Sequence, residues 1–247
     1  MSALVTAELL KLRTTRAWIG LVLAVLAVSA IGAAATVGTA TDLDLGSTNL
    51  SHDVIHSSLL AGFIAFLIGI TLVTTEWRHG TITRTFLVTP RRERVLMAKE
   101  LAALIVGVAL AVVALALVLA IAVVWLAIDG ATFGFDANVA ESLVRVLLSA
   151  ALWGALGVGV GAVIQSQTPA LVIAILWILV VEALVTALLG LVDLERVGDY
   201  LPGAALASFE GGSDTGLTGW AGGAVGLCWV VAFGLAGYLR ISRRDVT

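Results

Sequence analysis

Residues 101–128 form an uninterrupted apolar run without a single charged side chain. A helix needs about 20 mostly apolar residues to cross the hydrocarbon core of a bilayer, so this run is long enough to span it, with tilt. Alanine, leucine and valine dominate the run, and it lacks the two-residue alternation that a transmembrane barrel strand would show. The run therefore predicts a transmembrane helix.

Five further segments have the same apolar character. The whole chain of 247 residues is 60% apolar and 13% charged, whereas soluble domains are about 45–50% apolar and about 25% charged. Because most of a soluble protein's surface must stay wet, this composition excludes a soluble enzyme, a nucleic-acid reader and a disordered protein. We expect an all-α polytopic membrane protein, one transmembrane domain over residues 1–247, with six spans near 17–37, 57–75, 101–128, 143–164, 169–192 and 220–239.

The basic residues are distributed unevenly between the two sides of this six-span topology. Basic residues near span ends favour the cytoplasmic side, which places both termini in the cytoplasm. Only Arg145 and Arg196 then lie outside. The inside segments hold Lys11, Arg13, Arg16, Arg78, Arg84, Arg91, Arg92, Arg94, Lys99, Arg240, Arg243 and Arg244. The outside segments hold the acids Asp42, Asp44, Asp53, Asp129, Asp136, Glu141, Asp193, Glu195, Asp199, Glu210 and Asp214.

The segments outside the spans have distinct patterns. In residues 1–16, apolar side chains recur at helical spacing among charged ones, which predicts a short helix in the cytoplasmic interface. A plain basic flank that orients the first span is the alternative, and both can be true. Residues 38–56 read as a polar outer loop. Residues 193–219 read as a structured outer loop, and any part that dips into the bilayer must be covered by protein.

The inner loop, residues 76–99, is strongly basic and has an ordered pattern. Ile82, Phe86 and Leu87 fall on one side of a short helix, with Arg84 opposite. Thr89 can cap the next helix, and the Pro90 that follows it suits a first helical turn. We expect two short helices separated at Pro90 and projecting into the cytoplasm, of which the second runs straight into the third span. The alternative is a loop that only sets topology and contacts anionic lipid.

This order resembles the cytoplasmic loop of type-2 ABC exporter permeases, the six-span membrane subunits of many bacterial drug, peptide and polysaccharide exporters. The opening stretch from Glu8 to Arg13, followed by Arg16, also resembles that family's first interfacial helix. The matching residues of the loop are Glu76 directly after the second span, Arg78, Gly80-Thr81-Ile82, Thr89-Pro90-Arg91, and Lys99 just before the third span.

The resemblance implies a permease subunit of an ATP-driven exporter in the bacterial plasma membrane. Its inner loop would dock on a separate ATP-binding subunit and transmit that subunit's movement. The residues that carry this role over are Glu76, Arg78, Gly80, Thr81, Pro90, Arg91 and Lys99. The implied partners are this ATPase, a second permease subunit (identical or similar) and membrane lipid, but no nucleic acid.

The chain has no GxxxxGK[ST] phosphate loop, so it cannot supply the ATPase itself. We therefore expect no enzyme activity and no cofactor in this chain, with ATP and magnesium bound by the partner subunit. No nucleophile–base set lies within the spans. A further hypothesis is a non-transporting membrane anchor or sensor subunit. Only the ordered pattern of the inner loop argues against it. No cluster of residues in the sequence identifies the substrate.

Glu182 is the one acid deep within a span. It lies 13 residues after Pro169, which is roughly 20 Å along the fifth span. An intramembrane carboxylate is costly and is by default a functional candidate. It can be structural, paired with Arg145, or it can lie in the substrate path. The alternative function is an ion-coupled secondary transporter that uses Glu182. Such folds often have spans that are unwound at mid-membrane, whereas the sequence breaks no span at its middle.

Two weaker patterns remain. His52 and His56 have the i, i+4 spacing of a metal-binding pair, but the sequence offers no HExxH motif and no third histidine on that side. We expect a solvated loop and no metal site. The pairs Gly157–Gly161 and Gly222–Gly226 have GxxxG spacing, which serves helix packing either within the subunit or between two subunits.

Overall fold

The computed structural model describes residues 1–14, 17–41, 45–211 and 216–243. The regular elements within these ranges are all helices, and six helices among the described residues are long and apolar enough to cross a membrane. The prediction of an all-α chain with six spans is confirmed. Five charged residues used in the charge pattern lie outside the described residues: Arg16, Asp42, Asp44, Asp214 and Arg244.

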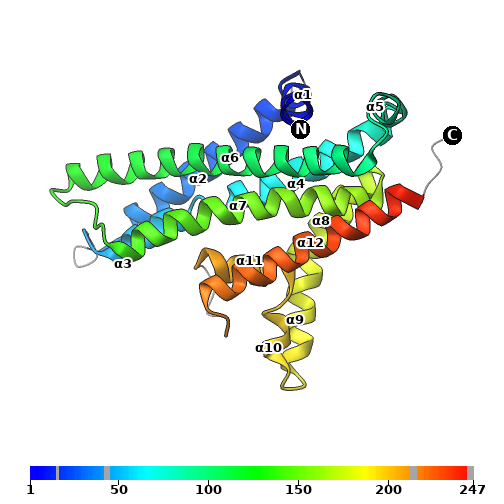
Figure 1. Ribbon diagram of the computed structural model, residues 1–247. Helices are drawn as coiled ribbons and strands as arrows, with labels where there is room; N and C mark the ends of the chain where they lie inside the picture. Colours follow the sequence, from blue (N-terminus) through cyan, green and yellow to red (C-terminus); the bar gives the residue numbers. More distant parts are fainter. Residues whose placement is uncertain (15–16, 42–44, 212–215, 244–247) are drawn as a thin grey trace.

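The long helices run along one another as an elongated bundle, with α5 at one end and α3 at the other (Figure 1). We call these ends the α5 end and the α3 end. The elements in chain order are α1 (Ser2–Thr14), α2 (Ala17–Gly38), α3 (Thr48–His56), α4 (Leu60–Arg78), α5 (Ile82–Val88), α6 (Arg92–Ile128), α7 (Ala137–Ile164), α8 (Gln167–Leu176), the π-helical turn η1 (Trp177–Val181), α9 (Glu182–Gly190), α10 (Glu195–Gly198), α11 (Pro202–Glu210) and α12 (Gly219–Arg243).

The centre of the bundle is α7, which packs against α4, α6 and α12. Small residues let α7 and α4 approach until their backbones touch. A Cβ atom on Gly157 would collide with the carbonyl oxygen of Phe66, and one on Gly69 would collide with that of Gly154. Close approach through small residues is how membrane helices gain van der Waals contact without a hydrophobic driving force.

The second GxxxG pair packs in the same way against α11. A Cβ on Gly222 would collide with the carbonyl oxygen of Ala205, and one on Gly226 would meet the side chain of Leu206. Both glycine pairs therefore serve packing within the chain, which is the first of the two alternatives that the sequence left open.

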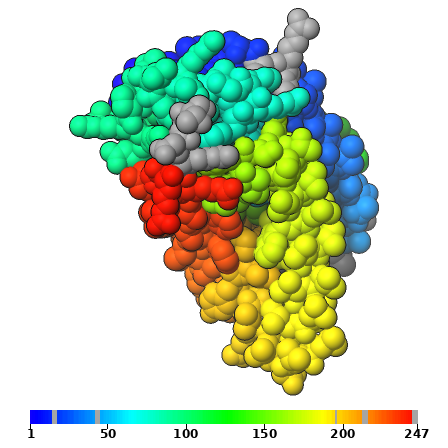
Figure 2. All heavy atoms as spheres, turned by 90° about the vertical axis from the view of Figure 1, so that its right-hand side faces the viewer, coloured from blue at the N-terminus to red at the C-terminus, as the bar shows by residue number. Residues whose placement is uncertain are grey.

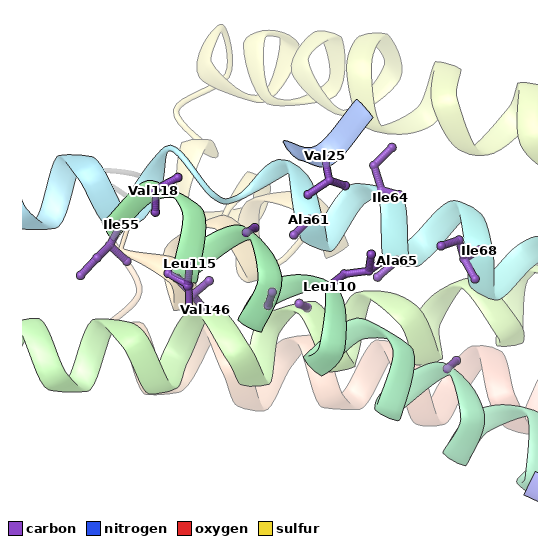
Figure 3. Close-up of a cluster of buried hydrophobic side chains, with 14 of the residues drawn as sticks. Val25, Ile55, Ala61, Ile64, Ala65, Ile68, Leu110, Leu115, Val118 and Val146 are labelled. Carbon is purple, nitrogen blue, oxygen red and sulfur yellow. The ribbon is translucent and has the colours of Figure 1, made fainter. Parts of the chain in front are cut away.

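The hydrophobic core lies between α2, α3, α4, α6 and α7 (Figure 3). Val25, Ile55, Val118 and Val146 each come from a different one of these helices and are almost fully buried. Tight interdigitation of this kind fixes how the helices lie relative to one another.

Residues 48–56 form helix α3, so the expectation of a polar, solvated loop there is wrong. The side chain of Ser47 accepts a hydrogen bond from the Leu50 amide and begins the helix. Leu50, Val54 and Ile55 are then buried because their spacing places them on one helical face. The Nδ1 atom of His52 lies 3.0 Å from the Ser142 hydroxyl on α7.

The fifth span departs from the rest of the bundle. Its last part, α9, projects away from the bundle with α10 at its tip (Figures 1 and 2). The π-helical turn Trp177–Val181 lies at the middle of this span. The span nevertheless continues as one helix from Gln167 to Gly190, so it is not broken at its middle. Such turns mark one inserted residue in an α-helix and often occur at functional sites. The apolar side chains of η1 and α9 are largely exposed, including Leu179, Val180, Leu184 and Leu188.

The segment 193–219 contains α10 and α11, and α11 returns to pack on α7 and α12. Ala205, Leu206 and Phe209 are buried there. The ring of Phe209 lies 5.5 Å from that of Trp220 at the start of α12. Packing of this segment against two long helices covers the backbone of α11, as the sequence analysis required of any part that dips into the bilayer.

Candidate functional site

Four charged side chains from three helices meet near the α5 end of the bundle. Glu8 and Lys11 come from α1, Glu76 from the end of α4 and Lys99 from α6. The Lys11 Nζ atom lies 2.6 Å from an oxygen of Glu8 and 2.6 Å from one of Glu76. The Lys99 Nζ atom lies 2.8 Å from the other oxygen of Glu8 and 3.1 Å from Glu76. We call these four residues the ion network.

Most of the ion network is buried. The side chain of Lys99 is 2% exposed, and those of Glu8 and Glu76 are 6% and 8% exposed. The Lys99 Nζ also donates to the carbonyl oxygen of Leu72, at 2.9 Å. Removing ions from water is costly unless each is paired and hydrogen-bonded, and two cations here balance two anions. The network therefore holds α1 in a fixed position against α4 and α6.

Lys11 is the member that reaches solvent. Burial lowers the pKa of Lys11, but its hydrogen bonds and attraction to Glu76 and Glu8 outweigh this effect and hold the pKa above the ordinary 10.5. Lys11 is therefore charged at neutral pH and bridges the two carboxylates there.

The structure divides the residues predicted to face an ATPase into two groups. Glu76 and Lys99 are brought together, but inside the ion network, where their side chains contact other parts of the same chain. Arg78 is exposed, and its Nη1 atom donates to the Gln167 side chain at 3.0 Å. Gly80 has a φ of +65° in the turn after α4, a conformation that favours glycine. The exposed group is Arg78, Gly80, Thr81, Pro90 and Arg91.

The short helix expected after Gly80 is present as α5, but its apolar face differs from the prediction. Ile82 is buried, and Phe86 lies beneath the Arg92 guanidinium, 5.2 Å from the ring centroid. Leu87 is 77% exposed and Val88 is 84% exposed. Ile82 and Phe86 are four residues apart and share a helical face, whereas Leu87 lies about 140° away from Ile82 at 3.6 residues per turn. Grouping Leu87 with the buried face was therefore wrong.

The start of the next helix also differs from the prediction. Thr89 ends α5 instead of capping α6. The chain stays extended through Arg91, whose ψ is 91°, and α6 begins at Arg92 without a side-chain cap. Pro90 disfavours helical geometry at the residue before it, which separates the two helices as expected.

A groove of about 650 Å³ lies between the tip of α5 and the start of α1. Met1, Leu4 and Val88 give it apolar walls, and Arg91 and Arg94 line it with positive charge. We call the groove together with exposed Leu87 and Val88 the α5 knob. An exposed apolar tip beside cations is suited to a protein partner with an apolar pocket and acidic neighbours.

Glu182 does not pair with Arg145, which corrects one of the alternatives above. Its Oε1 atom accepts hydrogen bonds from the backbone amides of Gly203 and Ala204, at 2.7 and 3.1 Å. These amides open α11, where unpaired N–H groups and the helix dipole favour a carboxylate. Arg145 instead pairs with Glu141, one turn away on α7, at 2.9 Å.

The sequence analysis did not identify Glu8 and Glu210 as buried acids that bind side chains of other helices. Glu8 was read only as part of an interfacial helix, although its spacing to Lys11 is a local sign of an ion pair. Glu210 was counted among the outer acids, yet it is buried and accepts hydrogen bonds from the Ser149 hydroxyl and, at 3.2 Å, from the Trp153 indole. No local signal marks Glu210, because its partners lie 57 and 61 residues away in the chain.

A family model described as ABC-2 family transporter protein matches residues 4–181. This range includes the ion network, α5, the first four spans, and the fifth span up to the end of η1. A comparison with curated proteins gives no match. The family match covers well over half of the chain, and it agrees with six apolar helices and with the order of the loop between α4 and α6. The chain therefore belongs to the ABC-2 family of transporter proteins.

Proposed function

We propose that this chain is the permease subunit of an ATP-driven exporter, and that a separate ATP-binding subunit docks on the α5 knob. The observation that carries the proposal is the position of Leu87 and Val88. They are the exposed apolar tip of a helix that is otherwise anchored to the bundle. Exposed apolar residues rimmed by polar ones are typical of protein interaction sites.

The contacts around the α5 knob explain how an ATPase movement reaches the spans. The chain enters α5 from α4 and leaves it into α6, and the ion network joins both helices to α1. Arg92 also donates to the carbonyl oxygen of Ile241 near the end of α12. A displacement of α5 therefore acts on several long helices at once, which favours a rigid-body movement over a local one.

The distribution of basic residues supports one orientation of the bundle in the membrane. The α5 end carries the basic residues of α1, α5, the start of α6 and the end of α12. In the positive-inside arrangement this end, with both termini, faces the cytoplasm of a bacterial cell. The exposed apolar side chains of η1 and α9 then face lipid or a second permease subunit, identical or similar to this one. ATP and magnesium bind to the ATPase subunit.

The test is copurification of the full chain from its native membrane in mild detergent, followed by mass identification. The variant Leu87→Asp with Val88→Asp changes only exposed side chains of the α5 knob. Its matched control is Leu191→Asp with Val192→Asp, which is also exposed but follows α9. Arg92 is not a suitable site, because it contacts Phe86 and Ile241 within the chain.

We expect an ATP-binding subunit to copurify with the native chain and with the control, and to be lost from the α5-knob variant. Absence of any ATPase from the native preparation would overturn the proposal, and so would equal recovery with all three chains. Ion-coupled transport through Glu182 has less support, since the carboxylate already accepts two backbone hydrogen bonds from α11.

A further inference from the structure

Glu100 on α6 has a buried carboxylate that forms no ion pair within the described part of the chain. Both of its oxygen atoms are buried, and neither has a hydrogen-bond partner among the described residues. The neighbouring Lys99 points to the other side of α6, where it pairs with Glu8 and Glu76. A carboxylate in such surroundings is costly without a partner, which indicates that a group outside this chain completes the site.

Glu100 lies in a groove of about 560 Å³ between α6 and α12, with α7 as its floor. The side chains from α6 recur at spacings of three and four residues and so share one face, and those from α12 do the same. Apart from Glu100, the walls are apolar over most of the length, with Leu104, Leu152, Leu227 and Val231 among them. Glu93 and Tyr238 bring the other polar groups, at the α5 end of the groove.

Gly234 on α12 faces the carboxylate. A Cβ atom placed on Gly234 would lie 3.6 Å from the Glu100 Oε1 atom, which is ordinary van der Waals contact, so a larger side chain at this position would press on the carboxylate. From there the groove continues toward Leu104 and Leu227, away from the α5 end. It runs over about 16 Å of α12, from Leu227 to Tyr238, at 1.5 Å per residue.

The chemistry of the groove restricts its occupant. Its volume is in the range of about 300–1,000 Å³ that is typical of small-molecule sites. The apolar walls favour a hydrophobic body, and one unpaired carboxylate favours a single positive charge. An anion would be repelled, and a neutral polar molecule would find few hydrogen-bond partners beyond Glu100.

We propose that the groove between α6 and α12 is a binding site for lipophilic monocations, with Glu100 as the counter-ion. The occupant lies with its charge beside Gly234 and its apolar part along Leu104 and Leu227. This inference rests on the proposed export function, because it names the substrate class of the permease. Met97 and Leu235 on the two walls of the groove are exposed at the surface of the bundle, so a membrane-dissolved cation can reach the groove from the bilayer.

The experiment measures equilibrium binding of tetraphenylphosphonium to the full chain in lipid nanodiscs. Tetraphenylborate is the probe of matched shape and opposite charge. Glu100→Gln removes the charge and keeps the shape, whereas Gly234→Leu keeps the charge and fills the groove. Glu182→Gln neutralises a buried carboxylate elsewhere and serves as the control. Each variant is first checked for a single size-exclusion peak and a cooperative melt.

We expect saturable binding of tetraphenylphosphonium to the native chain and to Glu182→Gln, but not of tetraphenylborate. Binding should weaken about tenfold or more in both groove variants, which corresponds to about 1.4 kcal/mol or more. Because two different variants test the groove, loss of folding in one still leaves the other. Unchanged affinity in a folded groove variant, equal weakening by Glu182→Gln, or no binding to the native chain would overturn the inference.

This assay needs no ATPase, so its outcome is separate from that of the copurification. If the ATPase copurifies but the cation does not bind, the exporter proposal stands and the substrate class is wrong. If the cation binds but no ATPase copurifies, the groove stands as a cation site and the exporter proposal fails.

Discussion

The Lys99 Nζ atom lies 2.8 Å from a carboxylate oxygen of Glu8, although 91 residues separate the two in the chain. The contact joins the first helix of the protein to the long helix α6 that follows the inner loop. Both side chains are almost completely buried. The pair therefore attaches α1 to α6, as Lys11 and Glu76 attach α1 to α4.

Removing the Lys99 charge should destabilise the protein strongly. In Lys99→Met, half-exposed Lys11 is the counter-ion that Glu8 and Glu76 keep among the described residues. Breaking a buried ion pair from one side costs about 3–5 kcal/mol, because a charge is left buried without compensation. The measurement is thermal unfolding of the purified chain in detergent.

A charge-balanced variant serves as the control for Lys99→Met. Glu8→Gln combined with Lys99→Met removes one charge of each sign, so we expect it to recover part of the lost melting temperature. A melting temperature of Lys99→Met equal to that of the native chain would show that the network does not hold α1.

The contribution of Lys11 to stability should disappear in strongly alkaline solution. The folded state raises the pKa of Lys11 above its ordinary 10.5. Its stabilising effect is therefore fully present below pH 10.5 and is lost as the pH rises through the higher folded value. The melting temperatures of the native chain and Lys11→Met should differ by a constant amount from pH 7 to about pH 10 and converge above that. A difference that already vanishes near pH 8 would contradict this account.

Replacing Glu182 should loosen α11 without abolishing transport. In Glu182→Ala, the amides of Gly203 and Ala204 lose their acceptor, and an unsatisfied buried group costs about 1–3 kcal/mol. Glu182→Gln keeps a carbonyl acceptor and should cost less. The measurements are melting temperature and ATP-dependent transport in proteoliposomes, with and without a proton gradient. Transport that needs both Glu182 and the gradient would favour ion coupling instead.

The contact between α4 and α7 should tolerate no added methyl group. In Gly157→Ala, the new Cβ would collide with the carbonyl oxygen of Phe66, and overpacking of this kind costs about 1–3 kcal/mol. Gly20→Ala on α2 is the matched control, because nothing lies within 4 Å of its Cβ position. We expect the control to be neutral or stabilising by up to about 1 kcal/mol, from helix propensity alone. Equal melting temperatures for the two variants would contradict the close packing.

The spans themselves follow from the sequence because their physical cause is local. A run such as residues 101–128 has no stable alternative to a helix in a bilayer, where each backbone polar group must be satisfied within its own segment. The run does not reveal that α6 begins earlier, at Arg92. That extension follows instead from Pro90, because a helix that starts just after it meets no helix-breaking residue before the apolar run.

The candidate site was predicted in part. Pro90 separates α5 from α6 as expected, because the restriction on its preceding residue acts locally. The prediction that Leu87 shares a helical face with Ile82 and Phe86 was wrong. A helix of seven residues contains too few turns for the apolar pattern to choose between neighbouring faces. Glu76 and Lys99 were predicted to face an ATPase, but the structure buries both side chains, because Glu8 and Lys11 reach them from α1.

The sequence by itself determined the class of protein, the six apolar spans, the clustering of basic residues and the resemblance of the inner loop, because each depends on composition or on neighbours a few residues apart. The tertiary structure alone decided that Lys99 meets Glu8 and that Glu182 accepts hydrogen bonds at the start of α11. It also decided that Glu100 faces an apolar groove with no hydrogen-bond partner among the residues that the structure describes. These relationships join residues from different helices. Their physical reason is the packing of whole helices, which sets which side chains share a buried space.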